Sequence, residues 1–311
     1  MFAHFTEQHV PTDRGPIFAR VGGHGPSLLL LHGYPQTHLM WHATADLLAE
    51  HHTVVAVDLP GYGKSFRPKP APDHAAHSKR ALALDLVQAM RELGHHSWAV
   101  AGHDRGGRIA YRMALDYPAK ITAAAVLDVV PTGEVWARAD AQLALIYWHW
   151  SFLAQPAPLP ERLIGADPGA FFDYHVRALG IGKTPGRYPE TLITAYRDLL
   201  DEPSTVEAIC EDYRAGATLD RDHDNADLGT RKIQCPLLLL WSQHGALPRL
   251  YGDVLDVWRP WAEHITGHGL DATHFLVEDQ PEEVAAELLT LLADRPTGPP
   301  PIPPHQSKGP S

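Results

Sequence analysis

The sequence predicts an α/β protein with a mostly parallel sheet, helices on both faces and a helical cap. Short apolar segments that read as strands alternate with helix-like segments over most of the 311 residues, which is typical of a parallel sheet covered on both faces. In the middle of the chain the alternation stops, and about 100 residues are helix-like throughout. One strand also runs through a glycine-rich turn straight into a helix, a junction that displays a reactive side chain above a sheet.

Each element follows from its local pattern. Strands are expected where short runs of Val, Leu, Ile and Ala lie between turn residues, and helices where apolar residues recur at helical spacing. In chain order, the sequence predicts strands at 16–21, 27–31 and 53–58, a helix at 79–93, a strand at 98–102, a helix from about 106 to 117, strands at 121–127 and 236–241, and a final helix at 281–293.

The helix-like stretch extends from about Pro131 to Thr230 and carries aromatic residues at helical spacing, among them Trp136, Tyr147 and Trp150. Because it lies between two strands of one sheet, we expect a cap that buries the substrate and excludes water. A second, unrelated helical domain is the alternative. The predicted division is a core formed by residues 1–133 and 231–295, a cap at 134–230 and a tail at 296–311.

The tail is rich in proline, with seven prolines between Pro296 and Ser311. Proline excludes both a helix and a central strand there, so we expect a disordered or polyproline segment, with a docking motif for a partner as the alternative.

Composition limits the possible partners and the compartment. The N-terminus has no basic start followed by an apolar run, so no signal peptide is expected, and the longest apolar runs are too short to span a membrane. Two cysteines, Cys210 and Cys235, make neither a disulfide scaffold nor a cysteine zinc site. The 26 basic and 37 acidic residues give a net charge of −11, which argues against nucleic acid and anionic membranes as partners. We therefore expect a cytoplasmic protein with reduced thiols.

The turn Gly102-His103-Asp104-Arg105-Gly106-Gly107 has the form G-x-nucleophile-x-G. Such a sharp turn forces strained backbone angles on its central residue, and the flanking glycines relieve the crowding. Hydrolases often have serine at this position, but here it is Asp104. A carboxylate displaces a leaving group from an alkyl carbon and forms an ester with it, so a carbon–halogen bond or an epoxide fits. The alternative is an aspartate that caps the following helix.

The ester on Asp104 needs a base that activates water, and His274 lies where the chain order nucleophile, acid, histidine requires it. His268 is a nearby competitor among 21 histidines. For the acid that orients the base, Asp128 ends an apolar strand, whereas the later strand offers no carboxylate before Asp253. Asp128 is therefore predicted by elimination, with a plain turn residue as the alternative.

Two further groups are expected around Asp104. The His32-Gly33-Tyr34-Pro35 step follows a strand, so the backbone N–H groups of Tyr34 and Arg105 could stabilise an oxyanion on Asp104. His103 is also assigned to this pocket. Arg105 and Arg108 lie one helical turn apart and can bind a substrate carboxylate through charge-assisted hydrogen bonds; salt bridges to acidic residues are the alternative.

Five segments together resemble the fluoroacetate (haloacetate) dehalogenases of the α/β-hydrolase fold: HGYPQTHLMWH, DLPGYGKS, GHDRGGRIAYRMAL, YWHWSFLAQPAPLPE and CEDYRAGA. The resemblance extends from about Gly15 to Ala293. It implies the hydrolysis of small anionic 2-haloacids to 2-hydroxyacids without a cofactor or metal, and a homodimer.

The resemblance also implies residue roles. Asp104 would be the nucleophile, with Asp128 and His274 as its partners and Arg105 and Arg108 as carboxylate ligands. His149, Trp150 and Tyr213 would form a halide pocket, because three converging N–H and O–H donors can replace the water around a small halide.

Two departures from the resemblance concern the pocket. The family tends to have a tryptophan in the region matching about Ala178 to Ile181, where this chain has no aromatic residue, and Tyr34 stands where a phenylalanine is common. A larger site that accepts a bulkier 2-haloacid is therefore expected. An epoxide hydrolase that uses Tyr147 and Tyr213 to protonate the epoxide is the second reading, and a catalytically idle binding protein is the third.

Overall fold

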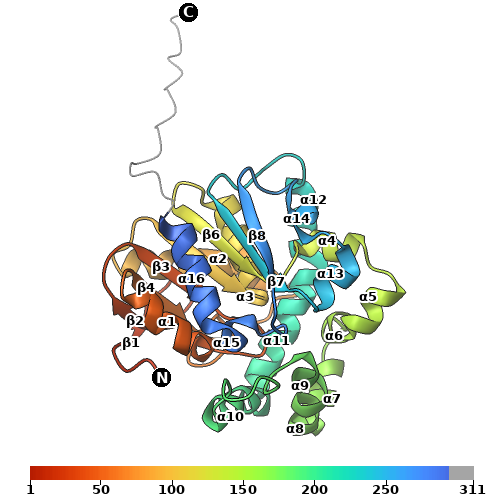
Figure 1. The fold of residues 1–311 in the computed structure, drawn as a ribbon. Helices are drawn as coiled ribbons and strands as arrows, with labels where there is room; N and C mark the ends of the chain where they lie inside the picture. Colours follow the sequence, from red (N-terminus) through yellow and green to blue (C-terminus); the bar gives the residue numbers. More distant parts are fainter. Residues whose placement is uncertain (294–311) are drawn as a thin grey trace, which may run out of the picture.

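The computed structural model describes residues 1–293 and centres on an eight-stranded sheet (Figure 1). The predicted tail at 296–311 lies outside the described residues. The strand order is β1-β2-β4-β3-β5-β6-β7-β8; β2 runs antiparallel to both of its neighbours, and from β4 to β8 all pairs are parallel. The strands are β1 (Thr6–Val10), β2 (Ile17–Gly23), β3 (Ser27–Leu31), β4 (Thr53–Val57), β5 (Trp98–His103), β6 (Ile121–Leu127), β7 (Leu237–Ser242) and β8 (Ile265–Leu270).

The predicted α/β class is confirmed, and the central strands lie where their apolar runs indicated. β3 and β6 have the expected bounds, and their side chains are almost all buried. The two edge strands were not delimited from the sequence. β1 is largely exposed and β8 contains a Gly-His-Gly run, so neither shows the continuous apolar pattern of a strand buried on both faces.

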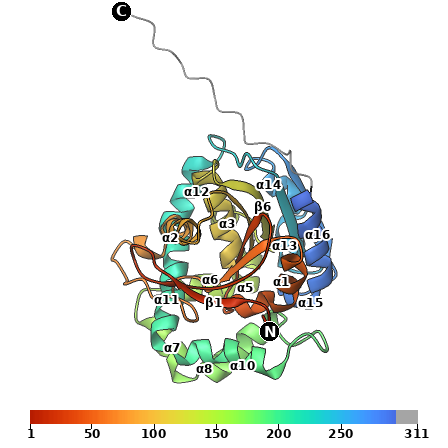
Figure 2. The same ribbon diagram turned by 90° about the vertical axis from the view of Figure 1, so that its left-hand side faces the viewer.

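Helices cover both faces of the sheet. α1 (His42–Ala49) and α16 (Pro281–Ala293) pack together on one face, while α2 (Lys79–Glu92) and α3 (Arg105–Asp116) cover the other (Figure 2). The remaining core helices are η1 (His38–Trp41), η2 (Ala75–His77), α13 (Ala246–Tyr251), α14 (Val254–Trp258) and α15 (Leu276–Asp279).

A helical insertion, residues 132–227, joins β6 to β7 and contains no strand. Its elements are α4 (Thr132–Ala137), α5 (Ala141–Ile146), α6 (Trp148–Leu153), α7 (Leu159–Ala166), α8 (Pro168–Phe171), η3 (Phe172–Val176), α9 (Arg177–Leu179), α10 (Glu190–Asp198), η4 (Leu199–Asp201), α11 (Pro203–Ala215), η5 (Gly216–Asp220) and α12 (Arg221–Asp227). In Figure 1 its helices α7 to α10 lie below the sheet, whereas α4 and α12 lie at the right-hand side of the core.

The chain order creates a place for a site at one end of the sheet. From β3 the chain moves outward to β4, and it then returns to form β5 on the other side of β3. The segments after β3 and β5 therefore diverge, and open α/β sheets bind ligands in the crevice at this point. Tyr34 follows β3 and Asp104 follows β5, so the fold brings these two residues to the same crevice.

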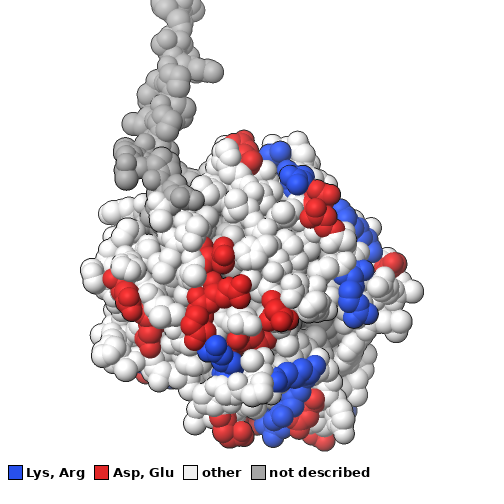
Figure 3. Space-filling model, viewed as in Figure 1, with Lys and Arg blue, Asp and Glu red and all other residues white. Residues whose placement is uncertain are grey.

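Acidic and basic side chains occupy different parts of the surface. On the face shown in Figure 3, acidic side chains gather near the centre, and Lys and Arg lie mainly along one rim and below. Over residues 1–293, no helix combines the length and the apolar composition that a membrane crossing requires.

Candidate active site

Asp104 occupies the turn between β5 and α3 in a strained conformation. Its backbone angles are φ 45° and ψ −114°, outside the regions that L-residues normally adopt. Its side chain makes no capping hydrogen bond to α3, so the helix-cap alternative is not observed. Instead Oδ2 accepts a hydrogen bond from the backbone N–H of Tyr34 at 3.0 Å. The turn therefore holds the carboxylate above the sheet, pointing toward the segment that follows β3.

The glycines of this turn are required by close packing. A Cβ on Gly102 would lie 2.3 Å from the carbonyl oxygen of Gly106, and a Cβ on Gly106 would lie 2.4 Å from that of His32. Any other residue at either position would push α3 away from the sheet. The G-x-D-x-G pattern thus reflects how tightly the helix begins against β3 and β5.

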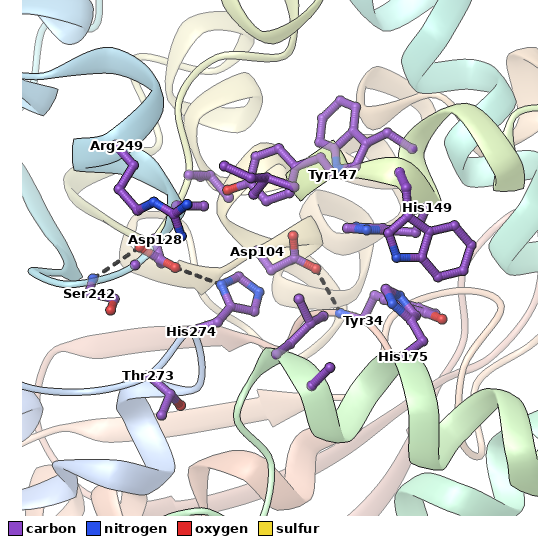
Figure 4. Close-up of a pocket in the computed structure, with 18 of the residues that line it drawn as sticks. Tyr34, Asp104, Asp128, Tyr147, His149, His175, Ser242, Arg249, Thr273 and His274 are labelled. Carbon is purple, nitrogen blue, oxygen red and sulfur yellow. Dashed lines mark hydrogen bonds and ion pairs between the residues drawn. The ribbon is translucent and has the colours of Figure 1, made fainter. Parts of the chain in front are cut away.

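His274 and Asp128 form a hydrogen-bonded pair beside Asp104 (Figure 4). His274 Nδ1 lies 2.6 Å from Asp128 Oδ2, and Asp128 Oδ1 accepts the backbone N–H of Ser242 at 3.0 Å. Since one ring nitrogen is engaged with the carboxylate, the other is free to act on water.

The competing residues lie elsewhere. His268 is on β8, where its Nε2 lies 3.7 Å from Glu287 on the surface. Asp253 caps α14 by accepting the N–H of Leu255. Neither of these residues lines the cavity around Asp104.

The charges of the site support an ionised Asp104. Burial alone would raise the pKa of Asp104, but the positive charges of His274, Arg105 and Arg108 outweigh it, and the pKa lies below its usual value. Burial would likewise lower the pKa of His274, but its hydrogen bond to Asp128 and the charges of Asp128 and Asp104 raise it. Asp104 is therefore charged, and the pKa of His274 lies above its ordinary value.

The two arginines are buried, but only one faces the cavity. Arg108 lines it and donates Nη1 to the carbonyl of Val130 at 2.9 Å and to Thr132 Oγ1 at 3.1 Å. Arg105 lies behind Tyr213, with its guanidinium carbon 4.2 Å from the centre of that ring.

The salt-bridge alternative therefore applies to Arg105 in part, because its Nε binds Asp212 Oδ2 at 2.5 Å. Its Nη1 is buried without a hydrogen-bond partner among the described residues. This leaves one donor for an additional ligand.

The three residues assigned to a halide lie together in the cavity wall. The ring centre of Tyr213 lies 5.9 Å from that of His149 and 5.9 Å from that of Trp150, and all three line the cavity. Burial and the neighbouring His175 lower the pKa of His149 well below its usual value, and burial and the Asp104 carboxylate raise that of Tyr213 well above its own. The imidazole is therefore neutral and the phenol protonated, so both present polar hydrogens without adding charge.

His103 departs from its assignment to the pocket wall. It ends β5 and lies behind His274, with Nε2 2.8 Å from the carbonyl oxygen of His274 and Nδ1 3.1 Å from Gln36 Oε1. Side chains alternate along a strand, so the residue before Asp104 faces away from it. Tyr34, by contrast, does line the cavity.

The cavity has a volume of about 500 Å³, within the range of roughly 300–1,000 Å³ that holds drug-sized ligands. Ala178 and Leu179 form part of its wall, in the region where the resemblance led us to expect an aromatic side chain. The cavity is correspondingly wide for a substrate with a two-carbon skeleton.

His175 is one of several cavity-lining residues that were not predicted from the sequence. His175 lies in η3, packs against His149 with ring centres 4.6 Å apart, and has an unpartnered buried Nε2. Burial lowers its pKa to about 4, so it too is neutral. Among 21 histidines, nothing in the sequence distinguishes it; η3 is a π-helical turn, a feature often found at functional sites.

Comparison with known proteins identifies the class of protein to which this fold belongs. The family model described as alpha/beta hydrolase fold matches residues 26–247. A solved structure of an alpha/beta hydrolase from Nostoc sp. PCC 7120 superposes with a TM-score of 0.91 at 44% identity, covering 94% of this chain and 100% of that one. The chain is therefore an α/β hydrolase.

Its similarity within that class is more specific. The chain is 43% identical to a fluoroacetate dehalogenase from Burkholderia sp., over 96% of this chain and 97% of that protein. A soluble epoxide hydrolase from Corynebacterium sp. (strain C12) is 29% identical, over 87% of this chain and 91% of that protein. The chain belongs to the fluoroacetate dehalogenase family of the α/β hydrolases.

Proposed function

We propose that the protein hydrolyses the carbon–halogen bond of small 2-haloacids, giving 2-hydroxyacids and halide. The observation that carries this proposal is a buried, ionised carboxylate at the strand–helix turn with Arg108 in the same cavity wall. The carboxylate supplies a nucleophile for an alkyl carbon, and the arginine supplies a ligand for the substrate carboxylate.

In the first step, Asp104 attacks C2 of the haloacid from the side opposite the halogen. The Asp104–C2 bond forms as the carbon–halogen bond breaks, and the halide leaves with the bonding electrons. Arg108, which lines the cavity, holds the substrate carboxylate through hydrogen bonds that contribute about 1.5–3 kcal/mol each, and Arg105, which lies behind Tyr213, adds its positive charge from outside the cavity wall. His149, Trp150 and Tyr213 take the halide, and their donors offset the loss of its hydration.

In the second step, His274 removes a proton from a water molecule, and the resulting hydroxide attacks the carboxyl carbon of the Asp104 ester. Asp128 stabilises the imidazolium that forms. The N–H of Tyr34, which already contacts Asp104 Oδ2, and that of Arg105 stabilise the oxyanion. Collapse of this intermediate expels the alkoxide, which takes the proton back from His274 and leaves as the 2-hydroxyacid; the other proton of the water is released to solvent as the Asp104 carboxylate is restored, and no external cofactor takes part in either step.

The most informative test is a substrate panel of fluoroacetate, chloroacetate, a chiral 2-fluoroacid and styrene oxide. Halide release from the acids is expected, with inversion at C2 of the chiral substrate because the nucleophile attacks from behind. Diol from styrene oxide without halide from any acid would overturn the proposal.

That outcome would favour epoxide hydrolysis, for which one observation speaks. Tyr147 and Tyr213 both line the cavity, and burial raises the pKa of each well above its usual value, so both keep the proton that an epoxide oxygen needs. The buried Arg108 favours an anionic substrate instead, since a neutral epoxide leaves its charge unused.

We further propose that the helical insertion acts as the cap and that the boundaries at 133/134 and 230/231 separate it from the core.

We also propose that the protein forms a homodimer and is located in the cytoplasm. Both cysteines are free thiols, which supports a reducing compartment. Exposed Leu145, Trp148 and Tyr174 on the insertion support self-association. Sedimentation equilibrium in the analytical ultracentrifuge, which measures the mass of the particle in solution, tests the homodimer.

A further inference from the structure

A buried carboxyl group lies behind the catalytic histidine and outside the cavity. Glu278 is on α15, four residues after His274, and only 2% of its surface is exposed. No Lys or Arg of residues 1–293 forms an ion pair with it, and Oε2 has no hydrogen-bond partner there. A buried carboxylate without a cation is costly, so the group calls for an explanation.

Glu278 is connected to His274 by a continuous line of polar atoms. Its Oε1 lies 2.5 Å from the side-chain nitrogen of Gln36. The side-chain oxygen of Gln36 lies 3.1 Å from His103 Nδ1, and His103 Nε2 lies 2.8 Å from the carbonyl oxygen of His274. The line thus runs from α15, through the segment after β3, to the end of β5 and the histidine loop.

The donors and acceptors fix the direction of this line. The carbonyl of His274 can only accept, so His103 Nε2 carries a proton. Burial lowers the pKa of His103 to about 3, so the ring is neutral and Nδ1 must accept. The amide group of Gln36 must therefore turn its N–H₂ toward His103 and its oxygen toward Glu278, the orientation opposite to the one assigned to it.

This orientation requires Glu278 to donate. Two oxygens at 2.5 Å fall within the usual range for O–H···O hydrogen bonds, whereas the same distance is short for N–H···O. Tyr196 of α10 contacts the same Oε1 at 3.1 Å, which connects the line to the helical insertion.

We propose that Glu278 is a positioning residue for the dehalogenation: its protonated carboxyl is the donor end of a directed hydrogen-bond chain through Gln36 and His103 that fixes the backbone carbonyl of His274. The proposal rests on the proposed function. His274 itself meets the water and the ester, and Glu278 acts through two intermediaries.

The surroundings of Glu278 favour its neutral form. Tyr196 and Tyr188 approach it from the insertion, and Asp279 next to it on α15 disfavours a second charge. η1 and α16 also pack against α15. Their titratable groups His38, Glu282 and Glu287 are paired with Asp58, Arg187 and His268, while Glu283 is exposed.

The hydrogen-bond chain from Glu278 to the His274 carbonyl should break when Glu278 ionises. Burial raises the pKa of Glu278 to about 8. A carboxylate can no longer donate, so Gln36 turns its N–H₂ toward it and presents its oxygen to His103 Nδ1. His103 then needs its proton on Nδ1 and loses the hydrogen bond to the His274 carbonyl.

The test compares the pH profiles of kcat for three variants with wild type. Wild-type kcat is expected to fall above about pH 8. Glu278→Gln keeps a permanent N–H donor to Gln36, so its alkaline decline should disappear. Glu278→Met has no donor, so kcat should fall about tenfold or more at every pH with KM little changed. Glu283→Gln, the same substitution at an exposed position of α16, should follow wild type.

An unchanged alkaline decline in Glu278→Gln would overturn the proposal. A second measurement is independent of turnover: the infrared C=O stretch of a protonated carboxyl should be present in wild type at pH 7, vanish above pH 8 and be missing in Glu278→Gln. If the band behaves in this way but no haloacid is hydrolysed, the proposed function is wrong and the hydrogen-bond chain from Glu278 is supported. If halide is released but the band is absent, the hydrogen-bond chain is refuted.

Discussion

Arg105 and Asp212 pair across the boundary between the sheet core and the helical insertion. Nε and Nη2 of Arg105 bind the carboxylate and the backbone carbonyl of Asp212 at 2.5 and 2.9 Å, and the other carboxylate oxygen binds Lys79 of α2. Asp212 precedes Tyr213 on α11. One aspartate therefore orients the buried cation behind the proposed halide ligand Tyr213 and connects the helix that carries this ligand to the core.

The first prediction concerns this pair. Asp212→Asn leaves Arg105 and Lys79 buried with reduced compensation, which costs about 3–5 kcal/mol and should lower the free energy of unfolding measured in urea. KM for a haloacid should also rise, because Arg105 loses its orientation. Asp222→Asn, at an exposed ion pair with Arg221, is the matched control and should change neither quantity.

The same carboxylate gives the stability a definite pH dependence. Burial would raise the pKa of Asp212, but Arg105 and Lys79 lower it to about 2. The pKa of Asp212 is near 4 in the unfolded chain and lower in the folded protein, so its ionised form stabilises the fold above about pH 4. This contribution is lost as the pH falls toward 2. Wild type should lose about 2 kcal/mol from this group over that interval, and a flat stability in this range would contradict the assignment.

The second prediction targets the covalent intermediate. His274→Asn removes the base but leaves Asp104 intact, so a haloacid should form an ester that is not hydrolysed. Intact-protein mass spectrometry should detect the adduct, and peptide mapping should place it on Asp104. Asp104→Asn should give neither adduct nor halide, and His268→Asn, at an exposed position on β8, should turn over normally. A His274 variant without an adduct would count against the mechanism.

The third prediction concerns the acidic side of the pH profile. His274 must be neutral to accept a proton, and Asp128 holds its pKa above 6.5. Steady-state kcat should therefore rise with pH through a midpoint above that value. In Asp128→Asn the hydrogen bond and the negative charge are both lost, so the midpoint should move to lower pH while the maximal rate falls. An unshifted midpoint would show that another group titrates.

The fourth prediction concerns substrate size. Leu179→Trp adds an aromatic side chain to the wall formed with Ala178. It should lower kcat/KM for a 2-haloacid with a bulky substituent by at least tenfold, because overfilling a packed cavity is penalised. Fluoroacetate should be hardly affected. Leu163→Trp, at an exposed position of α7, controls for the new side chain, and equal losses for both substrates would refute the size argument.

The sequence predicted that Asp104, Asp128 and His274 lie together at one end of the sheet, for a physical reason. Asp104, Asp128 and His274 each follow a strand, and parallel strands bring their carboxyl ends to one edge whatever lies between them. Local patterns therefore sufficed to find them.

The rest depends on contacts that local patterns do not encode. Asp212 is 107 positions from Arg105, and nothing near either residue announces the pair. His103 adjoins Asp104 in the sequence, but side chains alternate along β5, so it faces the His274 carbonyl and not the cavity. Glu278 reads as an ordinary acidic residue at a helix start, and only its burial against Gln36 and Tyr196 distinguishes it.

The helical insertion leaves the sheet after β6 and returns at β7, and these two strands pair directly, from Ala124↔Leu237 to Leu127↔Leu240. Its removal or replacement would therefore leave every strand contact in register. One uninterrupted stretch of coding sequence carries most of the groups proposed to select the substrate, while those proposed to break the bond are encoded outside it. New specificities could thus arise by exchange of that stretch alone, provided that the incoming segment supplies carboxylates for the buried cations Lys79, Arg105 and Arg112.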